Sequence, residues 1–154
     1  MKNNVVRIPL MLTLVAFLTS LPTAAHAIHC STAMVAGEWA GTLTGTLLLP
    51  TGPVPVAGVV RATVDINGNY TGTEARTIGG GYADETITGS WTVNPDCTGT
   101  NTLNAYESGQ LVRTSVLTIV FDDNAKQVRM VQKSLTLPDG TQLPVVLTLE
   151  GRKH

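Results

Sequence analysis

Few residues in this chain are of a type that does chemistry, and Glu74, Tyr70 and Arg113 stand out among them. A carboxyl or a phenol can transfer a proton when its surroundings shift the pKa, and a guanidinium can bind a carboxylate. Alternate spacing puts Tyr70 and Glu74 on one face of a segment, and puts Arg113 on the same face as Leu117 in another. The spacing therefore predicts that Glu74 and Arg113 form an ion pair inside the fold. In the alternative, one or both lie at the rim in water, because charged side chains are rarely fully buried.

The common motifs of hydrolases and metal enzymes are absent. The chain contains no Gly-x-Ser-x-Gly, His-Glu-x-x-His or Cys-x-x-Cys pattern. Beyond residue 27 the only histidines in the sequence are His29 and His154, one near each end of that stretch. We therefore assign no catalytic residue, no metal site and no cofactor, and the residue pattern leaves open whether the protein is an enzyme.

Strands must position the candidate residues. After Trp39, apolar and polar residues alternate with a period of two, and turn-forming residues interrupt the pattern at short intervals. No helix longer than one or two turns is expected. The predicted strands are residues 39–49, 58–66, 69–76, 85–93, 98–106, 111–121, 127–135 and 142–150.

The predicted fold class is all-β. An even number of sequential antiparallel strands, each with one apolar face, is best closed into an up-and-down barrel, because closure removes the exposed sheet edges. The sequence therefore predicts an eight-stranded antiparallel up-and-down barrel. A β-sandwich of two four-stranded sheets is the alternative.

In an up-and-down barrel, successive connections alternate between the two ends, so the order of the strands shows at which end each loop lies. The longest predicted loops, residues 50–57 and 77–84, fall at one end, which we take as a mouth, and tight turns fall at the other, the floor. Inward glycines such as Gly89 leave room, whereas Trp91 takes it away, so a small cavity is expected near the mouth, with Trp39 below it. The residues predicted to bind a ligand are Leu47, Tyr70, Glu74, Ile87 and Arg113.

Residues 1–27 have the layout of a cleavable secretory signal peptide. Lys2 and Arg7 precede an uncharged run, and small residues follow it up to Ala27. The protein is therefore expected to be secreted or periplasmic. The mature chain would carry eight basic and 11 acidic residues, which argues against nucleic acid as a partner. Polar outward faces argue against insertion into a membrane, and nothing indicates the oligomeric state.

The two cysteines, Cys30 and Cys97, are predicted to form a disulfide, because thiols oxidise outside the cytoplasm. The alternation of the connections also places the turn with Cys97 at the floor, the same end as Cys30. Residues 28–38 would then close the floor beneath a barrel domain of residues 39–154. Two unpaired buried thiols are the alternative.

The triplet Gly37-Glu38-Trp39 at the start of the first strand resembles the Gly-x-Trp signature of lipocalins and related calycins. In that family a basic residue after the last strand packs over the tryptophan. Arg152 is placed to do so here, through a cation-π contact with Trp39. The chain lacks the long C-terminal helix of true lipocalins. The resemblance implies a non-catalytic barrel that binds a small apolar molecule.

A second resemblance is local. The segment from Gly89 to Asn94, followed by Asp96-Cys97-Thr98-Gly99-Thr100, resembles small secreted bacterial proteins of mostly uncharacterised activity, which implies export and a β fold. The leading hypothesis is thus an exported, lipocalin-like protein that binds a small apolar molecule. One alternative is an enzyme resembling the allene-oxide-cyclase type of barrel, in which Glu74 or Tyr70 moves a proton. Another is a filled barrel that acts through its surface.

Overall fold

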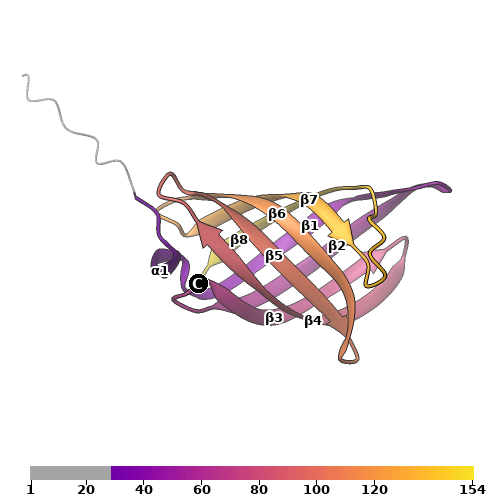
Figure 1. Ribbon diagram of the computed structural model, residues 1–154, viewed down its shortest axis with the longest axis horizontal. Helices are drawn as coiled ribbons and strands as arrows, with labels where there is room; N and C mark the ends of the chain where they lie inside the picture. Colours follow the sequence, from indigo (N-terminus) through magenta and orange to yellow (C-terminus); the bar gives the residue numbers. More distant parts are fainter. Residues whose placement is uncertain (1–28) are drawn as a thin grey trace, which may run out of the picture.

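The protein is a closed barrel of eight strands, each antiparallel to its neighbours in chain order (Figure 1). The computed structural model describes residues 29–154, and the predicted signal peptide lies outside these residues. The up-and-down barrel predicted from the alternating pattern is confirmed, and the sandwich alternative is excluded. The elements are α1 (Thr32–Val35), β1 (Gly37–Leu49), β2 (Gly52–Val64), β3 (Asn69–Ile78), β4 (Gly81–Val93), β5 (Thr98–Glu107), β6 (Gln110–Asp122), β7 (Gln127–Thr136) and β8 (Val145–Lys153).

Closure comes from the pairing of β1 with β8, which runs from Trp39 opposite Lys153 to Leu47 opposite Val145. Successive strand residues point to opposite faces, so one face of each strand forms the core. In β1 the buried residues are Trp39, Leu43 and Leu47, as the apolar alternation requires. The core therefore fills the inside of the barrel, and the polar faces of the strands form its outer surface.

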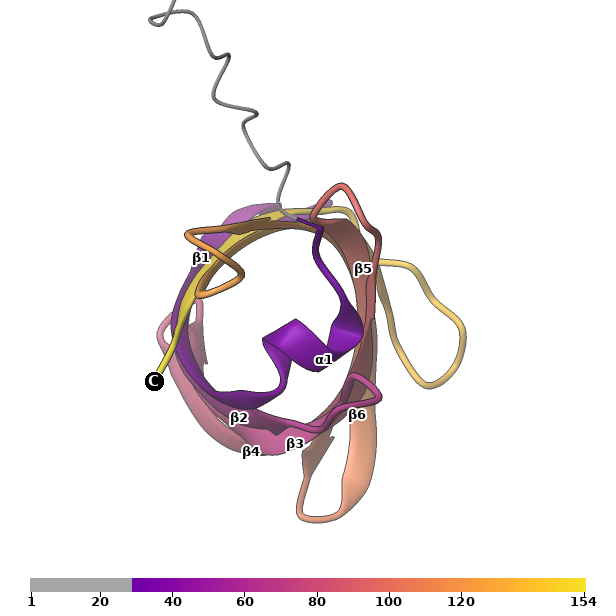
Figure 2. The same ribbon diagram turned by 90° about the vertical axis from the view of Figure 1, so that its left-hand side faces the viewer.

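The N-terminal segment covers one end of the barrel, called the lower end below. Figure 2 shows α1 lying across it. The predicted disulfide is confirmed: Cys30 is bonded to Cys97 in the turn between β4 and β5, with the two Cα atoms 4.9 Å apart. Val35 is fully buried, and its carbonyl oxygen accepts a hydrogen bond of 2.8 Å from Trp39 Nε1. The tryptophan that begins the core of β1 thus also holds α1 in place.

No helix within residues 29–154 is both long enough and apolar enough to cross a membrane.

The two long loops predicted at the opposite, upper end are mostly strand. β1 and β2 continue to a tight turn between Leu49 and Gly52. Pro53 and Pro55 suggest a loop in the sequence, but this part of β2 pairs only with β1, since its pairing with β3 begins at Val56. Proline has no N–H to donate and so fits a strand where one edge is unpaired.

The predicted loop 77–84 is also a hairpin. β3 and β4 pair as far as Ile78 opposite Gly81, which leaves Gly79 and Gly80 as the two turn residues. Their φ angles are 56° and 90°. A two-residue hairpin turn with positive φ at both positions favours glycine, which explains the glycine run here.

The last strand is shifted relative to its prediction. It spans Val145–Lys153 instead of residues 142–150, and it begins immediately after Pro144. Residues 137–144 form the longest connection within residues 29–154. Strand pairing between β7 and β8 stops at Val131 opposite Thr148, so the upper part of β8 is held by β1 alone.

Candidate functional site

Two small cavities lie inside the barrel, one above the other. The lower cavity, near α1, has a volume of about 30 Å³, and the upper cavity has a volume of about 50 Å³. Leu103 and Leu149 line both cavities and separate them. Figure 2, which looks along the barrel from the α1 end, shows no ribbon of residues 29–154 across the opposite end. The upper cavity is therefore the one nearer to the uncovered end.

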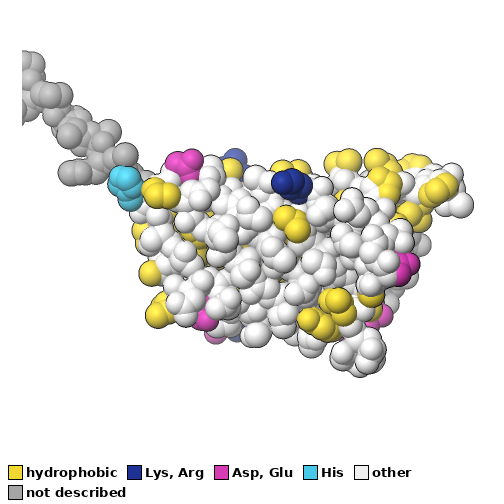
Figure 3. Space-filling model, in the orientation of Figure 1, with side chains coloured by type: hydrophobic (Ala, Val, Ile, Leu, Met, Phe, Trp, Pro, Cys, Tyr) yellow, Lys and Arg dark blue, Asp and Glu magenta, His cyan; other side chains and the backbone are white. Residues whose placement is uncertain are grey.

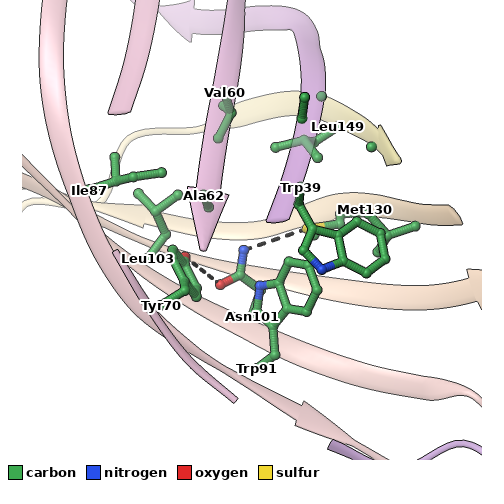
Figure 4. Close-up of a pocket in the computed structure, with 14 residues that line it drawn as sticks. Trp39, Val60, Ala62, Tyr70, Ile87, Trp91, Asn101, Leu103, Met130 and Leu149 are labelled. Atoms are coloured by element: carbon green, nitrogen blue, oxygen red, sulfur yellow. Dashed lines mark hydrogen bonds between the residues drawn. The ribbon is translucent and has the colours of Figure 1, made fainter. Parts of the chain in front are cut away.

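Aromatic side chains pack the lower half of the barrel. The ring centroid of Trp91 lies 5.1 Å from that of Trp39, 5.6 Å from that of Phe121 and 6.0 Å from that of Tyr70. Figure 4 shows the rings of Trp39, Tyr70 and Trp91 beside Asn101, whose Oδ1 accepts a hydrogen bond of 2.7 Å from the Tyr70 hydroxyl. A cavity of about 30 Å³ has room for about one water molecule. The lower half is thus a packed floor.

Glycine does not leave the space expected from the sequence. A Cβ atom on Gly89 would lie 2.5 Å from the hydroxyl oxygen of Tyr70 and would overlap the carbonyl oxygen of Thr102. The Tyr70 ring occupies the position where a larger residue at 89 would project. The glycine therefore allows a close approach of Tyr70, and it does not enlarge the cavity.

The upper cavity has apolar walls and a charged side. Glu74, Arg76 and Arg113 line this side, and two further polar residues, Ser115 and Gln132, also line the cavity. The Gln132 amide donates a hydrogen bond of 3.0 Å to the Ser115 hydroxyl. Its apolar walls comprise Leu43, Leu47, Val56, Ile78, Leu103, Leu117, Leu135, Leu147 and Leu149.

The three charged residues on this side belong to a network of two arginines and three glutamates, which we call the charged layer: Glu74, Arg76, Glu85, Glu107 and Arg113. Arg113 Nη2 lies 2.8 Å from Glu74 Oε1, and Arg113 Nη1 bonds to Glu85 Oε2. Arg76 Nη2 lies 2.5 Å from Glu85 Oε1 and 3.0 Å from Glu107 Oε1. Each guanidinium therefore contacts two carboxylates.

Glu74 and Glu85 are directly opposite each other on β3 and β4, and both are buried. Burial raises the pKa of Glu74; Arg113 opposes this effect, and the neighbouring Glu85 adds to it. Burial also acts to raise the pKa of Glu85, but hydrogen bonds from Arg76 and Arg113 outweigh it and leave that pKa below its ordinary value. The two carboxyls thus differ because Glu85 has two guanidinium partners and Glu74 has one.

The five residues predicted to bind a ligand are divided between the two cavities. Leu47, Glu74 and Arg113 line the upper cavity, and the predicted pair of Glu74 with Arg113 is present. Tyr70 and Ile87 line the lower cavity, together with Trp39. Burial raises the pKa of Tyr70, so its phenol stays protonated beside Asn101, away from the upper cavity.

Sequence reasoning missed Arg76, Glu85 and Glu107. The sequence did indicate the first two, because alternate residues of a strand lie on the same face. Arg76 therefore lies on the face of Glu74 in β3, and Glu85 lies on the face of Ile87 in β4. Both residues fell at the very ends of their predicted strands, where a charged residue suggests a solvated rim. The long hairpin of β3 and β4 brings them inside.

Arg152 does not pack over Trp39. It lies opposite Ala40 on β1 and opposite Gln127 on β7, and its side chain is exposed. The partner of Trp39 in the pairing of β1 with β8 is Lys153, whose Nζ donates a hydrogen bond of 3.0 Å to the Met34 carbonyl oxygen. Because β8 continues to Lys153, the basic residue that lies next to Trp39 is Lys153 and not Arg152.

The outer surface carries separate groups of exposed hydrophobic side chains. On the face shown in Figure 3 they gather mainly towards the end opposite α1. Leu48 and Val146, which point outward near that end, are 46% and 61% exposed. The rim around the uncovered end is therefore partly apolar on its outside as well.

Comparison with known proteins supports the fold. No protein-family model matches the chain, and no curated protein matches it. A solved structure of EF1p2_mFAP2b bound to DFHBI is similar, with a TM-score of 0.54 and 14% identity over 81% of this chain and 100% of that chain. A de novo designed fluorescence-activating β-barrel gives a TM-score of 0.49, with 14% identity over 81% of this chain and 99% of that chain. A redesigned barrel, mFAP1, bound to DFHBI, gives a TM-score of 0.48, with 20% identity over 80% of this chain and 98% of that chain. The first likeness shows an eight-stranded barrel fold, and at these identities none of them shows more.

Proposed function

We propose that this protein binds a small molecule with an apolar body in the upper cavity, without catalysis and outside the cytoplasm. The observation that carries the proposal is the asymmetry of the barrel: one end is closed by α1 and an aromatic floor, and the other is uncovered above a chamber with apolar walls. Such chambers with a few polar groups are the usual form of small-molecule sites. The disulfide supports export, because such bonds persist in oxidising compartments.

The size of the upper cavity limits the ligand. Its volume of about 50 Å³ is well below the roughly 300 Å³ or more of pockets that enclose drug-sized molecules. The ligand is therefore very small, or only part of it lies between the leucines and the rest extends past the rim. The similar barrel that was solved with DFHBI supports the proposal to the extent that a barrel of this fold can hold a small molecule.

Filling the upper cavity is expected to abolish binding. Leu47→Trp adds an indole to the buried inner face of β1, and Leu48→Trp makes the same change at the neighbouring, outward position. With the neutral apolar dye N-phenyl-1-naphthylamine, we expect Leu47→Trp to weaken binding by about tenfold or more, which is about 1.4 kcal/mol. Leu48→Trp should bind as the unsubstituted protein does.

Fluorescence titration of the mature protein measures both affinities, and circular dichroism checks that both variants remain folded. Equal weakening by the two substitutions, or no dye binding to the unsubstituted protein, would refute the proposed site.

A further inference from the structure

We propose that the tip of the hairpin formed by β1 and β2 docks on the surface of a phospholipid bilayer, with the uncovered end of the barrel facing the lipid. The partner is a bilayer of zwitterionic lipid, and the wall of the barrel stays outside it. This interaction surface goes beyond the proposed function, and it does not depend on whether a ligand binds in the upper cavity.

The hairpin of β1 and β2 projects beyond the strands on both sides of it. β1 pairs with β8 as far as Leu47, and β2 pairs with β3 from Val56 onward. Beyond these points the two strands pair with each other, up to Leu49 opposite Gly52. Residues 52–55 thus extend β2 past β3 by about 13 Å, at about 3.3 Å per residue. In Figure 1 this hairpin, drawn in purple, reaches further along the long axis than the other connections of the upper end.

The side chains of the projecting tip are apolar. Leu48 is 46% exposed, Pro50 and Pro53 are exposed, and Leu49 and Val54 are half-buried. Figure 3 shows hydrophobic side chains over this tip. Exposed apolar groups that gather on one part of a surface mark a site of contact with protein or membrane. Interfacial segments enter a bilayer to a depth of about 5–10 Å, which the projection of the hairpin allows.

Charge is distributed unevenly between the two ends of the barrel. The connections at the lower end contain four charged residues: Asp65, Asp96, Asp123 and Lys126. The connections at the upper end contain one, Asp139, and its connection ends short of the hairpin tip in Figure 1. The sequence has no charged residue between Glu38 and Arg61, so the tip enters lipid without dehydrating a charge. The same lack of lysine and arginine favours a zwitterionic bilayer over an anionic one.

The tip is poorly suited to contact with a second copy of the chain. Pro53 and Pro55 lie in the part of β2 beyond β3, and they lack the N–H that pairing with a further strand requires. A stable protein interface has about 20–30 residues on each side, whereas the projecting tip consists of residues 48–55. A bilayer surface requires neither strand pairing nor a large complementary face.

Flotation of the mature protein with vesicles of dioleoylphosphatidylcholine tests the inference. We expect the unsubstituted protein to float with the vesicles. Leu48→Glu should weaken this binding by about tenfold or more, because a carboxylate at the tip must lose water to enter the lipid. Ile66→Glu makes the same change of charge in the turn between β2 and β3 at the lower end, where Ile66 is 69% exposed, and it should leave binding unchanged.

Methyl NMR spectra with a phosphatidylcholine that carries a nitroxide on its acyl chain give the orientation of the bound protein. We expect broadening of the signals of Leu48 and Val54 and none of the signal of Ile66. Circular dichroism checks that the two variants are folded, and light scattering gives the oligomeric state of all three proteins.

The inference is wrong if the unsubstituted protein does not float, if both substitutions weaken binding equally, or if Ile66 gives the most strongly broadened signal. It is also wrong if Leu48→Glu converts a dimer into a monomer and leaves flotation unchanged, because the tip would then contact a second copy. None of these results bears on dye binding in the upper cavity, which is measured without vesicles.

Discussion

Glu85→Gln is expected to lower the free energy of unfolding by about 3 kcal/mol or more, the usual cost of removing one partner from a buried ion pair. The Glu85 side chain is fully buried and accepts hydrogen bonds from Arg76 and Arg113. Without it, Arg113 keeps only Glu74, and Arg76 keeps only Glu107 at the rim. Two largely buried guanidinium groups would each lose half of their carboxylate contacts.

Glu74→Gln is the matched control, because Glu74 lies directly opposite Glu85 and is equally buried. Its removal leaves two arginines with two carboxylates, and Arg113 keeps Glu85. We therefore expect a much smaller loss of stability at neutral pH than for Glu85→Gln. Urea unfolding of the three proteins, followed by tryptophan fluorescence, measures the difference.

The pH dependence of stability separates the two carboxyls further. The pKa of Glu85 is lowered by folding, so its contribution is present above the ordinary value of 4.5 and is lost as the pH falls through the folded value. The difference in the free energy of unfolding between the unsubstituted protein and Glu85→Gln should therefore become smaller at acidic pH. The pKa of Glu74 is raised by folding, so its contribution is present in acid and is lost as the pH rises. Equal effects of both substitutions at every pH would show that the charged layer is wrongly described.

Removal of the disulfide is the second change that we expect to lower the stability strongly. In the double variant Cys30→Ala with Cys97→Ala, we expect the free energy of unfolding to fall by about 4 kcal/mol, because the bond closes a loop with a sequence separation of 67. The structural consequence should be local to the lower end, where the bond ties the segment containing α1 to the turn after β4.

Hydrogen exchange distinguishes this effect from general destabilisation. The indole N–H of Trp39, which bonds to the Val35 carbonyl, should exchange faster in the double variant, because α1 is no longer tethered. The backbone amides of β1 and β8 near Leu47 should exchange more slowly, only at the rate that global unfolding of the variant allows. A loss of stability below about 1 kcal/mol would mean that α1 holds the floor through Val35 and Trp39 without the covalent bond.

Much of this architecture could be predicted because a strand has a fixed period of two. The alternation places Glu74 and Arg113 on inward faces, and strand parity places Cys97 at the same end as Cys30; the structure has both pairs in contact. The first prediction needs only the parity of each residue within its strand, and the second needs only the number of strands that precede the turn with Cys97. They tolerate errors of several residues in the strand ends.

Predictions that depended on strand ends were the ones that failed. Pro53 and Pro55 are compatible with a strand only where one edge is unpaired, and the sequence does not show that β2 extends beyond β3. The hairpin of β3 and β4 is longer than expected for the same reason, so Glu85 was not recognised as a buried partner. Arg152 was expected to follow the last strand and fold over Trp39, but β8 continues to Lys153 and holds Arg152 on the face opposite to the buried Leu147 and Leu149.

The division of the predicted ligand residues between two cavities also could not be read from the sequence. Parity shows that Tyr70 and Ile87 point inward, but it does not give their height in the barrel, which depends on the register between strands. The register places Tyr70 opposite Gly89, where the absence of a side chain lets its ring pack across the floor.

A methyl NMR titration of the mature protein with butan-1-ol tests the central claim most directly, since the upper and lower cavities have different methyl-bearing residues. We expect saturable shifts of the methyl signals of Leu47, Val56 and Leu147, which line the upper cavity, and no shift of Ile87, which lines the lower one. Shifts centred on Ile87, or no saturable shift in either cavity, would contradict binding in the upper cavity.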